Sequence, residues 1–151
     1  MVENERFDST TLEKMGVGSQ DIVLEVTERS AIQDYRLFFE RLKDSRKLGL
    51  QIAVDDVGSG YASLDAVVQL RPDFVKIDMV LIHDIDKDSL KRNIVESIVG
   101  FCKKSSVWTV AEGIETKEEL LVVKDLGVDF LQGYLLSRPK PEINVKSTFK
   151  D

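Results

Sequence analysis

Polar residues that could do chemistry recur at one end of successive apolar runs in this sequence. Glu25, Asp55 and Glu112 lie at or just beyond the C-terminal ends of three runs, and Lys76 and Gln132 hold the same place in two others. A single acidic residue there has an ordinary explanation, since Asp, Ser and Thr often cap the helix that follows. A polar residue at this end of run after run indicates a site, because catalytic groups of parallel-sheet enzymes lie at the carboxyl ends of strands.

The chemistry available at this rim is that of hard oxygen ligands. Like carboxylates a few ångströms apart raise one another's pKa or require a cation between them. Oxygen ligands suit Mg²⁺ or Mn²⁺, and a zinc site of nitrogen and sulfur ligands is not expected in a chain with one His and one Cys. The acidic residues expected at the rim are Glu25, Glu28, Asp55, Asp56, Glu112 and Glu115.

The adjacent pair Asp55 and Asp56 indicates a site with two ions, because one carboxylate can bridge while its neighbour serves a second ion. Paired metals about 3.5–4 Å apart are a recurring arrangement for attacking phosphodiesters. Lys76 among these acids would stabilise charge on a phosphate oxygen or orient the nucleophilic water. Residues 58–60 lack the continuation of a nucleotide-binding glycine loop and are expected to form a mobile loop over the site.

Short runs rich in β-branched residues are expected to form the strands that position these groups. They are nearly continuous apolar segments, which is typical of parallel strands covered on both faces. Between them the apolar period changes to that of a helix, and the connections are short. Alternating strands and helices predict a parallel α/β sheet, either open and doubly wound or part of a (β/α) barrel. The predicted strands are 22–26, 51–55, 74–78, 107–111 and 129–132.

Length and composition set further bounds. A chain of 151 residues has room for one domain with a core, and its net charge of −6 argues against a general DNA or RNA binder. No apolar stretch approaches the roughly 18 residues of a membrane span, and the first residues do not form a signal peptide. Cys102, the single cysteine, cannot form an internal disulfide, so we expect a cytoplasmic protein.

Segments of the sequence closely resemble, in order, successive motifs of the EAL domain, the family of cyclic di-GMP phosphodiesterases. The resemblance runs from about residue 5 to Pro141 and is highly specific, because every motif stands at the right interval. It implies a modified (β/α)8 barrel of the TIM type, a role in bacterial signalling, and hydrolysis of one phosphodiester of cyclic di-GMP to pGpG with two Mg²⁺ or Mn²⁺ ions. The segments are LEVTE at 24–28, DDVGSGYASL at 55–64, VKID at 75–78, AEGIE at 111–115 and QGY at 132–134.

The resemblance also implies a role for each matching residue. Glu25 and Asp55 resemble metal ligands, and Asp56 resembles a ligand of the second metal. Glu112 resembles the metal-site or general-base glutamate of the family. Lys76 is similar to the catalytic lysine that contacts the attacking water.

Further matching residues resemble supporting parts of the family's site. Glu28 resembles the glutamate that anchors the loop over residues 57–64. Glu115 and Gln132 resemble supporting site residues. Val57 and Ser59 replace the commoner Phe and Thr of that loop, and both changes are conservative.

One feature of the family is absent from the sequence. Neither the Glu-Ala-Leu motif, whose glutamate is a metal ligand, nor the Asn-bearing strand that follows it is found upstream of Glu25. We therefore expect a partial (β/α)8 barrel of about five parallel strands over residues 1–141, with a polar tail over 142–151. The open sheet edges predict self-association. The incomplete ligand set predicts weak or no phosphodiesterase activity of the isolated chain.

Two interpretations of function stay open. The first is an EAL-type phosphodiesterase domain, and the retained acidic residues favour it. The second is a non-catalytic EAL-like module that binds cyclic di-GMP or a protein partner, and the missing strands favour this one. An unrelated metal-dependent barrel enzyme would fit the polar rim but not the ordered motifs. Sensory or GGDEF domains upstream in a parent protein are compatible with both interpretations.

Overall fold

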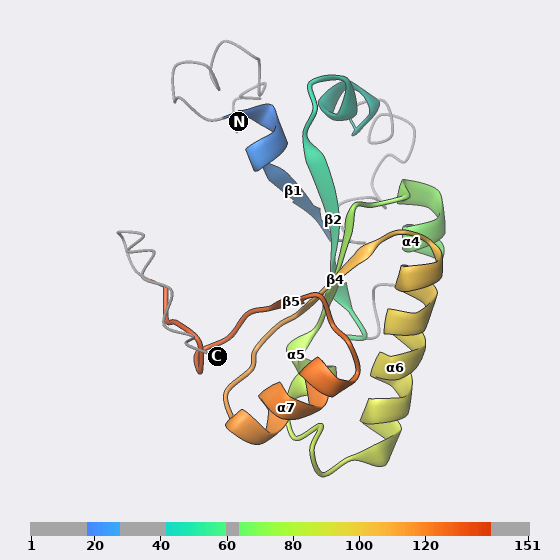
Figure 1. Ribbon diagram of the computed structural model, residues 1–151. Helices are drawn as coiled ribbons and strands as arrows, with labels where there is room; N and C mark the ends of the chain where they lie inside the picture. Colours follow the sequence, from blue (N-terminus) through green and yellow to red (C-terminus); the bar gives the residue numbers. More distant parts are fainter. Residues whose placement is uncertain (1–17, 28–41, 60–63, 140–151) are drawn as a thin grey trace, which may run out of the picture.

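The computed structural model describes residues 18–27, 42–59 and 64–139 of the chain (Figure 1). Its centre is one sheet of parallel strands, whose order in space, β1-β2-β3-β4-β5, is also their order along the chain. A doubly wound sheet reverses its strand order at a switch point, whereas a (β/α) barrel adds each strand next to the last one. The sheet therefore has the topology of part of a barrel. The strands are β1 (Val23–Val26), β2 (Gln51–Val57), β3 (Phe74–Ile77), β4 (Trp108–Ala111) and β5 (Phe130–Leu131).

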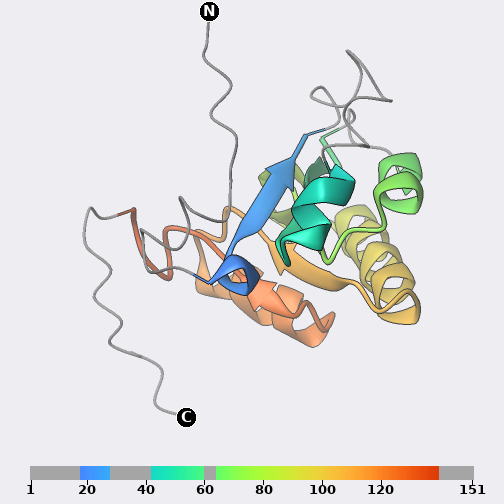
Figure 2. The same ribbon diagram turned by 90° about the horizontal axis from the view of Figure 1, so that it is seen from above.

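Helices follow the strands, as the change of apolar period predicted. Residues 42–47 are helical, and α4 and α6 lie side by side on the same side of the sheet in both views (Figures 1 and 2). The apolar stripe from Ile32 to Leu42 predicts a helix, and residues 32–41 of it lie outside the described residues. The capping box that the sequence predicts at residues 10–13, ahead of a short helix, lies outside them too. The other elements are η1 (Ser19–Asp21), α4 (Leu64–Leu70), α5 (Met79–Ile82), α6 (Ser89–Lys104) and α7 (Lys117–Asp125).

The helix ends are set by side chains that the sequence makes recognisable. Asp88 caps α6 by accepting hydrogen bonds from the N–H groups of Leu90 and Lys91. Thr116 and Glu119 form the capping box of α7, as the sequence predicts. Asp78, expected within a strand, instead caps α5 by accepting a hydrogen bond from Val80 N at 2.7 Å. The chain therefore leaves β3 and enters a short helix at once.

Among the described residues the core lies on one face of the sheet. Alternate strand residues such as Ile52, Val75 and Ile77 are fully buried against helix residues that include Ile82 and Val99. Burial on this face supplies most of the stability of the fold, at about 25 cal/mol per Å² of apolar surface.

The opposite face of the sheet has a different character. It carries Trp108 and Phe130, which are 54% and 49% exposed, with ring centroids 5.9 Å apart. The apolar runs are thus not covered on both faces within the part of the chain that the structure describes, which agrees with the expectation of a partial barrel. An apolar run cannot distinguish a residue covered by a helix from one that points into the interior of a barrel. No helix within the described ranges has the length and apolar character that a bilayer crossing requires.

Candidate functional site

An irregularity at the end of β2 brings two neighbouring carboxylates to one side of the sheet. Val54 pairs with Val75 and Val57 with Ile77, so β2 has one residue more than β3 between these pairs. Successive side chains of a regular strand point to opposite faces, but a bulge re-aims one of them. Asp56 lies in the bulge with φ of 60°, a left-handed conformation that Asp tolerates better than most residues.

The bulge has a direct chemical consequence. Asp55, Asp56 and Glu112 each place a carboxylate oxygen so that the three oxygens lie within 4.8 Å of one another. Glu112 comes from the end of β4, where its backbone N–H donates to Ile77 O of β3 at 3.1 Å. The carboxyl ends of β2, β3 and β4 therefore meet at a single acidic cluster.

The ammonium group of Lys76 lies at the centre of the carboxylates. Its Nζ is 2.9 Å from Glu25 Oε1 of β1, 2.9 Å from Asp55 Oδ1 and 2.9 Å from Glu112 Oε1. The side chain of Lys76 is 9% exposed, whereas that of Glu25 is 54% exposed. Residues from four adjacent strands thus form one ionic network, which opens toward solvent at β1.

This arrangement fixes the charge of Lys76. Burial would lower the pKa of its ammonium group, but hydrogen bonds to Asp55, Glu112 and Glu25 hold that pKa well above its ordinary value. Lys76 is therefore a permanent cation at neutral pH. It can donate hydrogen bonds and offset negative charge, but it cannot accept a proton.

Two carboxyl groups of the cluster, those of Glu112 and Asp56, also have raised pKa values. Burial raises the pKa of Glu112, and the charges of Asp55 and Glu25 raise it further, while the ammonium of Lys76 opposes this. Burial also raises the pKa of Asp56, together with the charges of Asp55 and Asp78. Both groups would be stabilised in the ionised form by a further cation.

The donor set fits a hard divalent cation. Asp55 Oδ1 is buried and, beyond its ion-pair contact with Lys76, accepts no hydrogen bond from a described residue. Four carboxylates, those of Glu25, Asp55, Asp56 and Glu112, face one ammonium, so negative charge is in excess. Carboxylate oxygens in this number suit Mg²⁺, Mn²⁺ or Ca²⁺.

A cavity of about 880 Å³ adjoins the acidic cluster. Glycines let its walls approach closely, because a Cβ at Gly113 would lie 2.4 Å from Met79 Cβ and one at Gly133 would lie 2.2 Å from Ile114 O. Arg138 lies over the ring of Tyr134, with Cζ 4.6 Å from the ring centroid. The cavity is lined by Asp56, Asp78, Met79, Glu112, Gly113, Glu115, Gln132, Gly133, Tyr134, Ser137, Arg138 and Pro139.

The structure brings together most of the residues that the sequence analysis named. Glu115 and Gln132 line the cavity beside the cluster, and Asp56 and Glu112 belong to both. Glu28 lies outside the described residues, and so do residues 60–63 of the loop that it was expected to anchor.

Several lining residues were not predicted. Asp78 stands at the end of the VKID segment, so its place at a strand end is a signal that could have identified it. Tyr134 lies in the QGY segment, but nothing in the sequence pattern indicates that Arg138 reaches the same cavity. Its place depends on the path of the chain after β5.

The comparisons with known proteins agree with this geometry. A family model described as the EAL domain matches residues 4–139. The probable cyclic di-GMP phosphodiesterase PdeA of Escherichia coli K12 is 38% identical over 125 residues, which are 83% of this chain and 17% of that protein. The cyclic di-GMP phosphodiesterase PdeB of Shewanella oneidensis is 37% identical over 125 residues, or 83% of this chain and 15% of that protein.

Solved structures show the same similarity. The manganese and cyclic di-GMP complex of Klebsiella pneumoniae BlrP1 at pH 9.0 superposes with a TM-score of 0.82 and 36% identity, and the match covers 86% of this chain and 33% of that one. The Bacillus subtilis YkuI protein, in complex with cyclic di-GMP and calcium, has a TM-score of 0.77 and 28% identity, over 89% of this chain and 33% of that one. The chain thus spans less than a quarter of these two curated relatives and about a third of these two solved chains. On the family match and these identities, the chain belongs to the EAL domain family.

Proposed function

We propose that this EAL domain binds cyclic di-GMP and hydrolyses one of its phosphodiester bonds, giving pGpG, with Mg²⁺ or Mn²⁺ at the acidic cluster. The observation that carries the proposal is the convergence of carboxylates from β1, β2 and β4 around the buried ammonium of Lys76 on β3. The names of the relatives, which include cyclic di-GMP phosphodiesterases, support the choice of substrate.

The charge of the site explains why a metal would be needed. Cyclic di-GMP carries two phosphodiester groups and is therefore an anion, which the excess of carboxylates would repel. Glu25, Asp55, Asp56 and Glu112 are the residues that would hold the ions. Bound divalent ions supply positive charge that polarises the phosphate and makes a bound water acidic.

The protein side chains would then orient the reacting groups. Lys76 keeps its proton, and its three N–H donors face three carboxylates. Exchange of one of these contacts would let it donate a hydrogen bond to the attacking water or to a phosphate oxygen. Glu112 is the better candidate for a general base, because its carboxylate can accept a proton, whereas the ammonium of Lys76 cannot. The two side chains are 2.9 Å apart, so one water can contact both.

The cavity provides a place for the rest of the substrate. Gln132 and Glu115 offer hydrogen-bonding groups, while Tyr134 and Arg138 offer an aromatic face and a cation. A guanine base combines an aromatic surface with polar edges, and it suits these groups. The cavity volume of about 880 Å³ is typical of a small-ligand site.

We also propose that the 151-residue chain, assayed alone, turns over slowly. Its sequence holds no Glu-Ala-Leu motif, and no described strand pairs with the outer edges of β1 or β5. Both features reduce the affinity for metal, because each ligand and each rigid neighbour contributes to a site.

We infer self-association through the open edges, a cytoplasmic location, and a domain over residues 1–141. Upstream sensory or GGDEF domains in a parent protein are compatible with this proposal. The reduced and buried thiol of Cys102 suits a reducing compartment.

A second candidate function is a non-catalytic module that binds cyclic di-GMP or a protein. The observation in its favour is that Lys76 forms ion pairs with three carboxylates, so the protein itself offsets part of the negative charge of the cluster. In this case the cavity would bind the nucleotide, and the cluster would serve only the stability of the fold.

A turnover assay separates the two candidates. The chain is incubated with cyclic di-GMP and Mn²⁺, and pGpG is measured by chromatography beside the Asp55→Ala variant and an Asp44→Ala control on the exposed helical segment. We expect slow conversion that requires Mn²⁺ and is lost in Asp55→Ala but not in Asp44→Ala. Binding without any conversion would favour the module, whereas a kcat on the order of 10 s⁻¹, typical of enzymes, would contradict slow turnover.

A further inference from the structure

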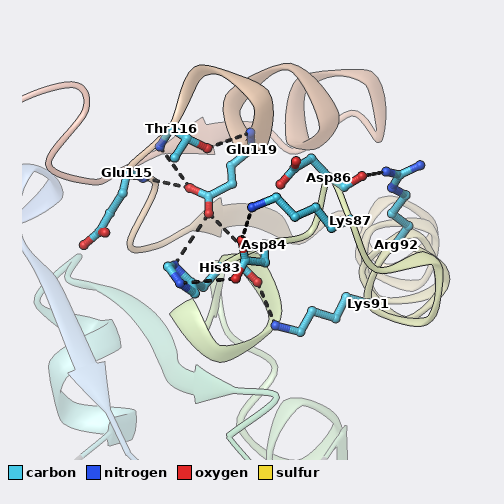
Figure 3. A network of polar contacts seen from close by, with 9 residues as sticks. All are labelled: His83, Asp84, Asp86, Lys87, Lys91, Arg92, Glu115, Thr116 and Glu119. Carbon is cyan, nitrogen blue, oxygen red and sulfur yellow. Dashed lines mark hydrogen bonds and ion pairs between the residues drawn. The ribbon is translucent and has the colours of Figure 1, made fainter.

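A second polar network adjoins the cavity and is centred on the carboxylate of Glu119 (Figure 3). The residue is 1% exposed and belongs to the first turn of α7. Its Oε1 accepts a hydrogen bond from Asp84 N at 2.9 Å. Its Oε2 accepts hydrogen bonds from Glu115 N at 2.9 Å and from Thr116 N at 3.0 Å. One buried side chain thus satisfies three backbone donors.

These donors belong to two parts of the chain that carry different site residues. Asp84 lies just after α5, the helix that follows β3 and Lys76. Glu115 and Thr116 lie in the segment that leads from β4 and Glu112 into α7. The carboxylate of Glu119 therefore links the segment that follows Lys76 and α5 to the segment that follows Glu112. Asp84 and Glu119 are 35 residues apart in the sequence.

The same junction forms one wall of the cavity. Gly113 approaches α5 so closely that a Cβ there would lie 2.4 Å from Met79 Cβ. Met79, Gly113 and Glu115 all line the cavity. A shift between α5 and the segment after β4 would therefore move the wall and the cluster together.

Helix capping accounts for only part of this arrangement. A capping box needs the bond from Thr116 N to the Glu119 carboxylate, together with the bond from Glu119 N to Thr116 Oγ1, which is 3.2 Å. The bonds to Asp84 and Glu115 lie outside that motif. Burial would raise the pKa of Glu119, but the backbone donors of Glu115, Asp84 and Thr116 hold it below its ordinary value, so the group is an anion and accepts on both oxygens.

We propose that Glu119 is a positioning residue of the candidate site. Its carboxylate holds the backbone just after α5 against the segment that follows Glu112. These contacts set the spacing of Lys76, Glu112 and the cavity wall. This inference rests on the proposed function for its metal, but the spacing itself belongs to the protein. Outer residues that orient ligands typically change metal affinity 10–100-fold when they are replaced.

The test uses Glu119→Gln with Glu118→Gln as a matched control. Both residues lie in the first turn of α7, and both variants lose one negative charge, but Glu118 is exposed. The amide of a Gln at position 119 can accept on one side only, so its NH₂ group opposes either Asp84 N or the donors of Glu115 and Thr116. Circular dichroism establishes that each variant folds. If Glu119→Gln does not fold, Glu119→Asp replaces it, since the shorter side chain cannot reach both parts of the chain.

Two readouts follow. The first, without metal, is hydrogen exchange of the Glu112 amide, which bonds to Ile77 O across the junction. The second is the dissociation constant of Mn²⁺ alone, from the electron paramagnetic resonance signal of the free ion. We expect Glu119→Gln to speed the exchange and to weaken Mn²⁺ binding, each by about tenfold or more, and Glu118→Gln to change neither by more than about twofold.

The outcomes separate this inference from the proposed function. Exchange of Glu112 in a folded Glu119→Gln within about twofold of the unsubstituted chain would overturn the positioning role. If the unsubstituted chain binds no Mn²⁺, the proposed metal site fails, and the exchange of Glu112 alone decides the role of Glu119.

Discussion

At the scale of single residues, Lys76 carries the charge balance of the site. Three carboxylate oxygens lie 2.9 Å from its Nζ in a position that is almost closed to solvent. A group whose pKa is raised in the folded state stabilises that state fully below its ordinary pKa, and the effect is lost only as the pH rises through the raised value. For Lys76 the stabilisation is therefore complete at neutral pH.

Replacing Lys76 with Met tests this balance. The variant keeps most of the packing but leaves the carboxylates without their cation, so we expect a loss of about 3 kcal/mol of unfolding free energy at pH 7. The pKa of Glu112, already raised, loses the one influence that lowers it. A carboxyl with a raised folded pKa is destabilising when ionised, so the variant should recover stability as the pH falls from 7 to 5. Urea unfolding at both pH values measures this, with Lys43→Met on an exposed helical turn as the control; equal losses at both pH values would contradict it.

Asp56 illustrates a conflict between stability and function. It combines a left-handed φ of 60° with repulsion from Asp55 and Asp78. Asn tolerates the same backbone and carries no charge, so Asp56→Asn should stabilise the metal-free chain by about 0.5–1 kcal/mol and weaken Mn²⁺ binding. Urea unfolding in EDTA and a Mn²⁺ titration measure the two effects. A variant that is less stable in EDTA would show that the carboxylate is held by favourable contacts instead.

At the scale of elements, glycines set how closely the segments around the cavity approach. A Cβ at Gly133, just after β5, would lie 2.2 Å from Ile114 O, so the segments after β4 and β5 touch through their backbones. Gly100 in α6 has open space around it. The two positions are therefore a matched pair for one substitution.

We expect Gly133→Ala and Gly100→Ala to change stability in opposite directions. The first forces backbone apart and should cost about 2 kcal/mol or more of unfolding free energy. The second removes a flexible residue from the interior of a helix and should add about 0.5–1 kcal/mol. Thermal unfolding of both variants gives the comparison, and a Gly133→Ala chain as stable as the unsubstituted one would show that the two segments can separate freely.

The elements also show what the sequence could and could not predict. The strands were located within two residues, because each apolar run ends where the polar rim begins. The extension of β2 to Val57 was not predicted, since a bulge depends on pairing with β3 and not on composition. Asp78 directly follows the apolar residues of β3, so the sequence pattern placed it in the strand. The same position at the strand end brings it to the cavity.

The candidate site, like the strands, could be predicted from the sequence only in part. The acidic rim could be predicted because residues at strand ends meet wherever parallel strands pair. The three ion pairs of Lys76 could not be predicted, since they depend on how far side chains from four strands extend toward one another. The contacts of Arg138 with Tyr134 and of Glu119 with Asp84 depend on the paths of loops, which the periodicity of the sequence does not determine.

Across the molecule, as far as its residues are described, the outer strands of the sheet have an edge without a described partner strand, and one face is partly exposed. Phe130 on the outermost strand is 49% exposed, and Trp108 beside it is 54% exposed. Unpaired strand edges template pairing with another chain, and apolar exposed faces favour contact. The described part of the molecule therefore offers a surface for a second copy.

We expect the chain to self-associate at micromolar concentration. A lysine on an edge strand opposes edge pairing, so Phe130→Lys should shift the sedimentation coefficient toward that of the 17.1 kDa monomer. Leu121→Lys on α7, where the residue is 66% exposed, is the control for an added charge away from the sheet edge. A monodisperse monomer before any substitution would rule out this surface as an interface.

We propose that Glu25, Asp55, Asp56 and Glu112 hold divalent ions against the phosphate of cyclic di-GMP. Isothermal titration of the chain with cyclic di-GMP, in Ca²⁺ and then in EDTA, tests it most directly, because Ca²⁺ accompanies this ligand in the YkuI complex. We expect binding in Ca²⁺ that weakens by more than about tenfold in EDTA and in Asp55→Asn, but not in Asp44→Asn. Equal affinity in Ca²⁺, in EDTA and in Asp55→Asn would contradict it.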